Sequence, residues 1–528
     1  MKKTSKALLL MMLLILHACA AKLPFEQVMV EQGIVEGVVE GDLRLFKGIP
    51  FAAPPVGDLR WKAPLPAEKW DGVKRTTDFA AAPMQSGNPA SGKSEDCLYL
   101  NIWTPAQRAD EKLPVMVWIY GGGFSFGATS DPTTDGTKMA HKGVVLVSIA
   151  YRVGPFGFFS HPALSAESAQ GVSGNYGLLD QIAALKWVQQ NIAAFGGDPG
   201  RVTIFGESAG GISVSMLCAS PLAKGLFHAA ISQSGGSFGP PRSKTYPGEN
   251  MKTLAQAELE GASYLSGMGL STIDELRTME AEQLLPKGWS FSGAGGWPII
   301  DGYVIPDDQY KMYEQGTYHP IPVLIGYNSD EGLSFSPGKT ADAYITSVRE
   351  RFGPFADTLI TAYPVNGDKA GRSARNLVRD AAFGWHTWSW ARLQADTSKV
   401  YYYYFDRHPA YPADSPMADH GTPHGVDVGY VFMNLDAANP TVTDEEIAFS
   451  DTMGTYWTNF AKYHDPNGEG LPQWPAFNND DRAVLHLGSV VSVGPVPDEA
   501  SLEVMDRYFK WRRSAEGAFP DSISTDKQ

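Results

Sequence analysis

The chain contains only three cysteines in 528 residues. Cys19 lies at the N-terminus, so Cys97 and Cys218 are the two that remain beyond it. Two cysteines do not form a disulfide framework, and no paired Cys and His spacing typical of zinc sites is present. These absences argue against a disulfide-stapled protein and against a structural metal site.

Basic residues are also scarce, because 43 Lys and Arg stand against 58 Asp and Glu, which gives a formal net charge of −15. Nucleic-acid-binding proteins need a basic surface, so we expect no nucleic-acid partner. Linker-like stretches and internal repeats are missing too. Hydrophobic residues make up 43% of the chain, enough for a large core. We therefore expect a single domain over residues 22–520.

Long apolar runs are lacking except near the N-terminus. There a positively charged start precedes Ala7–Leu16, which is too short to span a bilayer and is typical of an export leader. Ala18-Cys19-Ala20 predicts a signal peptide over residues 1–20. Leu16–Cys19 also resembles a bacterial lipoprotein box, which would end the leader at residue 18 and place lipid on Cys19. Both interpretations predict export, as a periplasmic, membrane-anchored or secreted protein.

Three short motifs supply a serine, an acid and a histidine. They are Gly206-Glu207-Ser208-Ala209-Gly210, Ser329-Asp330-Glu331-Gly332 and His424-Gly425-Val426-Asp427. The chain order Ser, acid, His is that of the α/β-hydrolase scaffold, and the chymotrypsin and subtilisin orders differ from it. The order predicts acyl transfer to serine and then to water.

The pattern Gly-x-Ser-x-Gly occurs at Ser125, Ser208 and Ser237. A nucleophile elbow needs a buried strand before the serine and a helix directly after it. Ser208 alone has both, in the β-branched run 201–205 and the apolar segment 209–217. Prolines that soon follow the other two serines oppose a helix there. Ser208 is therefore the predicted nucleophile, and Ser125 and Ser237 are predicted loop residues.

A glycine run, Gly121-Gly122-Gly123, directly follows a predicted strand. Glycines let backbone N–H groups turn toward a ligand, and an ester hydrolase needs such donors where negative charge develops. By the α/β-hydrolase pattern the donors are Gly122, Gly123 and Ala209, the residue after the nucleophile. A phosphate-binding loop would need a following helix, and no helical pattern follows.

Glu331 follows the apolar strand 322–326, at the strand end where the acid that orients a histidine should lie. The adjacent Asp330 is its rival. His424 lies in a loop-like segment after the strand 400–405, and such loops carry catalytic bases. His420 is the close competitor.

Strand and helix signals alternate, which predicts an α/β fold with a large, mostly parallel central sheet flanked by helices. The predicted strands span residues 113–120, 144–150, 202–205, 229–232, 322–326 and 400–405. Apolar residues from Leu178 to Ile192 fall at helical spacing. Trp385, Trp388 and Trp390 belong to a helical region, and we interpret them as core residues.

Together these motifs resemble the type-B carboxylesterase/lipase family, which includes the cholinesterases. Residues 46–57, 95–101 and 205–211 are similar to its three sequence signatures, and the resemblance covers nearly the whole mature chain. It implies the triad Ser208, Glu331 and His424, the oxyanion hole Gly122, Gly123 and Ala209, and the structural ion pairs Arg60–Glu95 and Arg152–Asp180.

The chain departs from the family pattern around Cys97. The usual bridging cysteine is absent near Met84, so Cys97 and Cys218 are expected to be free and mostly buried. The loop Gln85–Asp96 has no tryptophan for choline and is too short and polar for a lipase lid. Counting back from the landmark Trp297–Gly302 places Ser292 and Ala294 at the acyl pocket, where short side chains predict room for acyl groups longer than acetyl.

We therefore expect an exported serine carboxylesterase that acts on small-molecule esters through an acyl-enzyme and needs no cofactor or metal. A histidine base predicts activity that rises through roughly pH 6 to 7, around the ordinary histidine pKa of about 6.5. The alternatives are a related hydrolase of carbamates, aryl amides or polyesters, and a non-catalytic adhesion relative.

Overall fold

The computed structural model describes residues 23–518 except 243, 287–294, 337–338, 366, 368–369, 410, 413, 437 and 440. The predicted leader with Cys19 and the predicted acyl-pocket residues Ser292 and Ala294 lie outside the described residues. Among the described residues, no helix is long and apolar enough to cross a membrane.

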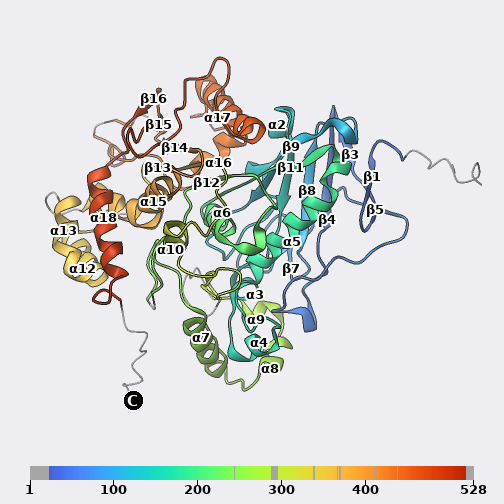
Figure 1. The fold of residues 1–528 in the computed structure, drawn as a ribbon, viewed down its shortest axis with the longest axis horizontal. Helices are drawn as coiled ribbons and strands as arrows, with labels where there is room; N and C mark the ends of the chain where they lie inside the picture. Colours follow the sequence, from blue (N-terminus) through green and yellow to red (C-terminus); the bar gives the residue numbers. More distant parts are fainter. Residues whose placement is uncertain are drawn as a thin grey trace, which may run out of the picture.

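An 11-stranded mixed sheet forms the centre of the molecule (Figure 1). Its strand order is β16-β15-β14-β13-β12-β11-β9-β10-β8-β4-β3. The strands are β3 (Val38–Glu40), β4 (Leu43–Pro50), β8 (Tyr99–Thr104), β9 (Leu113–Ile119), β10 (Val145–Ile149), β11 (Gly197–Glu207), β12 (Ala229–Gln233), β13 (Val323–Asn328), β14 (Val400–Phe405), β15 (Val484–Leu487) and β16 (Val491–Gly494). The strands from β10 through β15 run parallel, and antiparallel strands close both edges. The predicted α/β class with a mostly parallel sheet is confirmed.

The central strands are mostly apolar and deeply buried because helices cover both sides of the sheet. Every residue of β10, β12, β13 and β14 is buried, as expected for parallel strands. Helix α6 (Ala209–Ala219) packs on β11 and β12, and α17 (Asp444–Tyr463) packs on β9 and β11. The six predicted strands are present. β11 begins earlier than predicted, because Gly196 makes the turn at φ 84° and the pairing with β9 shifts register between Gly197 and Val202.

The remaining helices lie around the sheet (Figure 1). They are α2 (Thr137–His141), α3 (Gly154–Phe158), α4 (Pro162–Glu167), α5 (Tyr176–Asn191), α7 (Leu254–Gly267), α8 (Ile273–Arg277), α9 (Ala281–Leu284), α10 (Gln309–Glu314), α11 (Gly332–Phe335), α12 (Ala341–Phe352), α13 (Ala356–Ala362), α14 (Gly371–Arg379), α15 (Trp385–Gln394), α16 (Val426–Val431) and α18 (Glu499–Arg512). A π-helical turn, Asp380–Gly384, joins α14 to α15. The short strands β1 (Gln27–Val30), β2 (Gly33–Glu36) and β5 (Val73–Arg75) form a separate small sheet, and β6 (Ala82–Pro83) pairs with β7 (Lys93–Ser94).

Several expectations about individual residues are confirmed. Trp385, Trp388 and Trp390 are buried in the core. The guanidinium groups of Arg60 and Arg152 form ion pairs with the carboxylates of Glu95 and Asp180. Cys97 and Cys218 are both free and buried. The loop Gln85–Asp96, which the structure describes in full, contains the short strand β7 and no helix that could serve as a lid.

Candidate active site

Ser208 occupies the tight turn between a strand and a helix. β11 ends at Glu207 and α6 begins at Ala209. The backbone of Ser208 has φ 55° and ψ −124°, a conformation that non-glycine residues rarely adopt. Its N–H donates to the carbonyl of Gln233 at 2.9 Å, and its carbonyl accepts from the N–H of Ile212 at 2.8 Å. The predicted strand–turn–helix context of Ser208 is confirmed.

Glycines on both sides of Ser208 allow the turn to press against the end of β9. A Cβ atom at Gly210 would lie 2.0 Å from the carbonyl oxygen of Ile119, and one at Gly206 would lie 2.5 Å from the carbonyl carbon of Gly210. Both distances are far below van der Waals contact, so only glycine fits at these positions without a backbone shift. Ser125 and Ser237 lie in loops, as predicted.

The structure brings together the predicted serine, histidine and acid. Nε2 of His424 lies 2.8 Å from Oγ of Ser208, and Nδ1 lies 2.5 Å from Oε2 of Glu331. The other carboxylate oxygen, Oε1, accepts hydrogen bonds from the hydroxyl of Ser234 at 2.5 Å and from the N–H of Asn328 at 2.7 Å. The Nδ1 contact assigns the ring proton to Nδ1, which leaves Nε2 free to accept the proton of the Ser208 hydroxyl.

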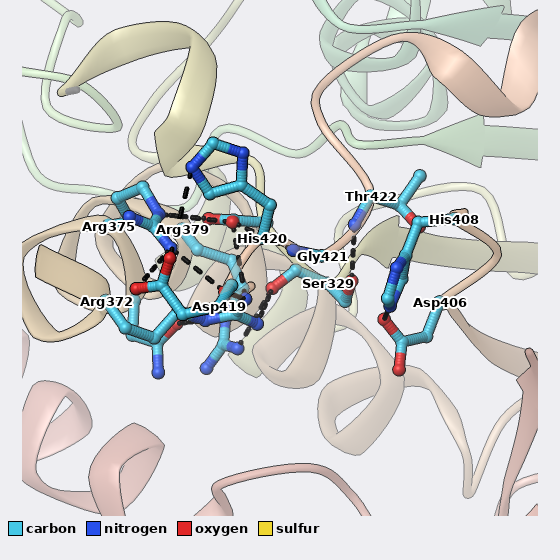
Figure 2. Close-up of polar contacts among 12 residues, drawn as sticks. Ser329, Arg372, Arg375, Arg379, Asp406, His408, Asp419, His420, Gly421 and Thr422 are labelled. Carbon is cyan, nitrogen blue, oxygen red and sulfur yellow. Dashed lines mark hydrogen bonds and ion pairs between the residues drawn. The ribbon is translucent and has the colours of Figure 1, made fainter. Parts of the chain in front are cut away.

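The two rival residues point elsewhere. The carboxylate of Asp330 accepts from the guanidinium of Arg375 at 3.0 and 3.1 Å and from the N–H of Gly421 at 3.1 Å. His420 lies beside Asp419, whose carboxylate is 4.0 Å from its Nε2 (Figure 2). The geometry therefore favours Glu331 over Asp330 as the acid and His424 over His420 as the base.

The three predicted oxyanion donors flank Ser208. Gly122 and Gly123 have φ angles of 96° and 58°, and both line the cavity above the serine. The loop that they form approaches the elbow closely, since a Cβ on Gly121 would lie 3.1 Å from Cβ of Ser208. Ala209 is the first residue of α6, and N–H groups in the first turn of a helix have no acceptor within that helix. The three residues thus lie around Ser208, and the role of their N–H groups as oxyanion donors stays a prediction.

A cavity of about 600 Å³ opens over Ser208 and His424. Its walls are largely apolar or backbone, and they include Phe126, Ile212, Trp297, Phe335, Ala382 and Phe383. Thr245–Gly248 and Asn250 form another side. Among the described residues that line it, the charged side chains are those of Glu207 and His424. The cavity therefore suits a ligand that is mostly uncharged.

Two further carboxyl groups lie near His424, and sequence reasoning gave them no role. Oε1 of Glu207 is 3.2 Å from Nε2 of His424, and burial raises the pKa of Glu207 to about 8. Burial also raises the pKa of Asp427, whose carboxylate accepts from the side-chain amides of Gln233 at 2.7 Å and Asn328 at 3.1 Å. Burial alone would lower the pKa of His424, but Glu207 and Glu331 outweigh it and raise that pKa to about 9.

Aromatic rings enclose the imidazole of His424. The ring of Phe383 stacks on it at a centroid distance of 4.8 Å, and the ring of Phe335 meets it edge-on at 5.0 Å. Phe383 belongs to the π-helical turn between α14 and α15, and π turns recur at functional sites. The two rings exclude water from the parts of the imidazole that they cover. The sequence carried no periodic signal for this contact.

The chain is similar to known esterases over most of its length. The model of the carboxylesterase family matches residues 25–504. Fumonisin B1 esterase of Sphingopyxis macrogoltabida is 38% identical over 497 residues, which cover 88% of this chain and 86% of that protein. Para-nitrobenzyl esterase of Bacillus subtilis is 36% identical over 497 residues, which cover 89% of this chain and 96% of that protein.

Solved structures give the same result. A PNB esterase structure aligns with a TM-score of 0.79 and 35% identity over 91% of this chain and 100% of its own. A carboxylesterase of Geobacillus stearothermophilus aligns with a TM-score of 0.77 and 32% identity over 91% of this chain and 99% of its own.

Proposed function

Since the chain belongs to the carboxylesterase family and is a carboxylic ester hydrolase, we propose that Ser208 is its nucleophile, His424 its general base and Glu331 the acid that orients the histidine. One observation carries this proposal. A continuous chain of hydrogen bonds runs from Oγ of Ser208 through both ring nitrogens of His424 to Glu331, at the floor of the cavity. A base within hydrogen-bond reach of the nucleophile, itself oriented by a third group, is the arrangement that activates serine.

The reaction proceeds in two halves. Nε2 of His424 takes the proton of the Ser208 hydroxyl while Oγ attacks the ester carbonyl carbon. The N–H groups of Gly122, Gly123 and Ala209 donate to the oxyanion, and the carboxylate of Glu331 stabilises the imidazolium. The imidazolium then protonates the alcohol oxygen as the bond to the carbonyl carbon breaks. The alcohol departs, and the acyl group remains bound to Oγ of Ser208. Water attacks the acyl-enzyme, with His424 again as base, and the carboxylic acid leaves.

We propose small-molecule esters with uncharged, mostly apolar acid and alcohol parts as substrates. The support is the cavity, whose walls are largely apolar or backbone. The name of the Bacillus relative makes para-nitrobenzyl esters a suitable first probe. We also predict that butyryl esters react better than acetyl esters, by about 0.8 kcal/mol for each additional methylene that is buried. This prediction depends on the short side chains of Ser292 and Ala294, which lie outside the described residues. Matched amides and carbamates in the same panel address the alternative hydrolases.

The nucleophile is tested by three single substitutions in the same motif. Ser208→Ala should lower kcat by about 10⁶, a loss typical of a triad serine. Ser125→Ala and Ser237→Ala should keep most of the wild-type kcat, because neither hydroxyl contacts His424 at hydrogen-bond distance. Turnover that survives in Ser208→Ala and disappears in Ser237→Ala would contradict the assignment. Labelling with a serine-directed organophosphate separates a working esterase from a non-catalytic relative.

We also propose that the protein is exported. The support is the leader-like sequence at residues 1–20, or at residues 1–18 with a lipid anchor on Cys19. Mass spectrometry of the mature N-terminus distinguishes the two, since cleavage after Ala20 leaves Ala21 first and the lipoprotein route leaves a modified Cys19. An N-terminus that retains Met1 would contradict export by either route.

A further inference from the structure

The loop that carries His424 is docked on the loop that carries Glu331, residue against residue. The side-chain amide of Asn328 donates to the carbonyl of Pro423 at 2.8 Å. The hydroxyl of Ser329 accepts from the N–H of Thr422 at 2.8 Å. The N–H of Asp330 donates to the carbonyl of Thr422 at 2.9 Å, and its carboxylate accepts from the N–H of Gly421 at 3.1 Å. The residues just before the acid thus hold those just before the histidine.

The two loops are also in tight van der Waals contact. A Cβ atom on Gly421 would lie 2.4 Å from Oγ of Ser329, so a side chain at this position would displace the Ser329 hydroxyl or the loop. The carboxylate of Asp330 is completely buried at this contact. A buried carboxylate is stable only when its oxygens are paired and hydrogen-bonded.

Arginines of α14 supply that pairing and reach both loops at once. Nε of Arg375 donates to both oxygens of Asp330, and Nη1 of Arg372 lies 3.3 Å from one of them. The same two guanidinium groups donate to the carbonyl of Asp419, at 3.1 and 2.7 Å. Figure 2 shows Arg372 and Arg375 beside Asp419, next to Ser329 and Gly421. The carboxylate and the histidine loop therefore share one set of donors.

We propose that Asp330 is a positioning residue for the reaction, and that its carboxylate, clamped by Arg372 and Arg375, fixes the histidine loop so that His424 meets both Ser208 and Glu331. The proposal rests on the proposed function of that triad. Under this proposal Asp330, the residue next to Glu331 in the sequence, has a function separate from that of the triad acid. Asp330 does not contact the reacting atoms and acts through the backbone of Gly421 and Thr422.

The contact between the two loops determines where His424 lies, because this residue is not part of a strand or helix. β14 ends at Phe405 and α16 begins at Val426, so the histidine sits in the connection between them. Its Nε2 lies 2.8 Å from Oγ of Ser208, and its Nδ1 lies 2.5 Å from Oε2 of Glu331. A displacement of about 1 Å would break one of these contacts, and such a displacement lowers rates by about 100-fold.

The test compares Asp330→Asn with a matched substitution, Asp308→Asn. Asp308 is also a buried aspartate in an ion pair, with Arg513, but it caps α10, and among the described residues it forms no hydrogen bond or ion pair with the histidine loop. For each variant, the melting temperature, kcat, KM and the pH dependence of kcat/KM are measured with a soluble uncharged nitrophenyl ester. The carboxyl groups that act on His424, those of Glu331, Glu207 and Asp427, are unchanged in both variants.

In Asp330→Asn, kcat should fall by about 10- to 100-fold with KM within about twofold, since the cavity is intact and only His424 is displaced. The acid limb of the pH profile should move to lower pH, because a displaced His424 is attracted less by Glu331. The low-field proton NMR signal of the His424 Nδ1–H should broaden or shift. In Asp308→Asn the melting temperature should fall, while kcat, the acid limb and the proton signal stay at the wild-type values.

A folded Asp330→Asn enzyme with wild-type kcat and a wild-type acid limb would overturn the proposal. If Asp308→Asn lost kcat to the same extent as Asp330→Asn, the loss would not be specific to the histidine loop, and the proposal would also be overturned. If Asp330→Asn does not fold, Ser329→Ala removes only the acceptor of the Thr422 N–H. It should shift kcat and the acid limb in the same direction by a smaller amount, and no change would overturn the proposal. Organophosphate labelling located by mass spectrometry distinguishes the two failures. A label away from Ser208 would contradict the proposed function, whereas a label on Ser208 at wild-type rate in Asp330→Asn would contradict the clamp alone.

Discussion

Glu207 shares the Nε2 side of His424 with the nucleophile, and its removal should change the pH dependence of the enzyme. Its Oε1 is 3.2 Å from Nε2, and Oγ of Ser208 is 2.8 Å away. Charge attraction by Glu207 is the largest single cause that raises the pKa of His424, and Glu331 raises it through both its charge and its hydrogen bond. The histidine must be neutral to act as a base, so activity appears as the pH rises through its pKa and is lost as the pH falls.

The size of the effect follows from the pKa. A value of about 9 for His424, against an ordinary histidine value of about 6.5, corresponds to about 3.4 kcal/mol of net attraction for the proton. Glu207→Gln removes the largest single charge attraction and leaves both interactions of Glu331, so it should remove part of this, on the order of 1 kcal/mol. The acid limb of kcat/KM should then move to lower pH by about one unit. Because burial also raises the pKa of Glu207, to about 8, the proton bound in that range is shared by the pair.

The assay is kcat/KM between pH 5 and 10 with an ester that does not ionise, since this quantity reports the free enzyme. Wild-type activity should still rise above pH 7, later than the sequence alone predicts. Glu207→Gln should level off at lower pH, and Glu503→Gln, on the exposed face of α18, should match the wild type. If the wild type and Glu207→Gln both level off near pH 6.5, the electrostatic reasoning is wrong.

Two further predictions concern thiol reactivity and stability. Cys97 and Cys218 are buried and burial raises the pKa of both thiols, so they should resist a thiol reagent in the native protein and both react after denaturation; rapid labelling of the native enzyme at either position would contradict this. Burial opposes the charge on Glu249, but Arg351 and neighbouring arginines outweigh it and lower its pKa, so its stabilising effect is present at neutral pH and is lost as the pH falls. Glu249→Gln should therefore lower the free energy of unfolding by about 3–5 kcal/mol at pH 7 in urea titrations, with a smaller difference near pH 4, and equal stability at pH 7 would refute the reasoning.

The sequence predicted those parts of the fold whose signals are local. Continuous apolar runs marked the central strands, because both faces of a parallel sheet are buried. The elbow at Ser208 was predictable because a strand, two glycines and a helix are adjacent in the chain. The ion pairs of Arg60 and Arg152 followed from the family resemblance and are present.

The contacts around His424 depend on long-range geometry and could not be predicted in the same way. Glu207 is next to the serine in sequence, but whether its side chain faces the histidine depends on the turn angles of the elbow. Phe383 reaches the imidazole from a π turn, which has no distinctive spacing of apolar residues. Asp330 looked like a second candidate acid because sequence cannot show which of two adjacent carboxylates points toward α14.

The sheet explains why the chain order of the triad is informative and also why the histidine needs an anchor. β11, β12, β13 and β14 are neighbours and parallel, so Ser208 after β11 and Glu331 after β13 emerge at the same edge, with β12 between them. Two strand spacings separate them by about 10 Å at the backbone, more than one direct hydrogen bond can cross. An imidazole that arrives from the connection after β14 bridges this gap through contacts of 2.8 and 2.5 Å. Because His424 lies between β14 and α16 and not on a strand, strand pairing cannot hold the ring in place. The hydrogen bonds of Asn328, Ser329 and Asp330 to the histidine loop fix its position, as strand pairing would if His424 lay on a strand.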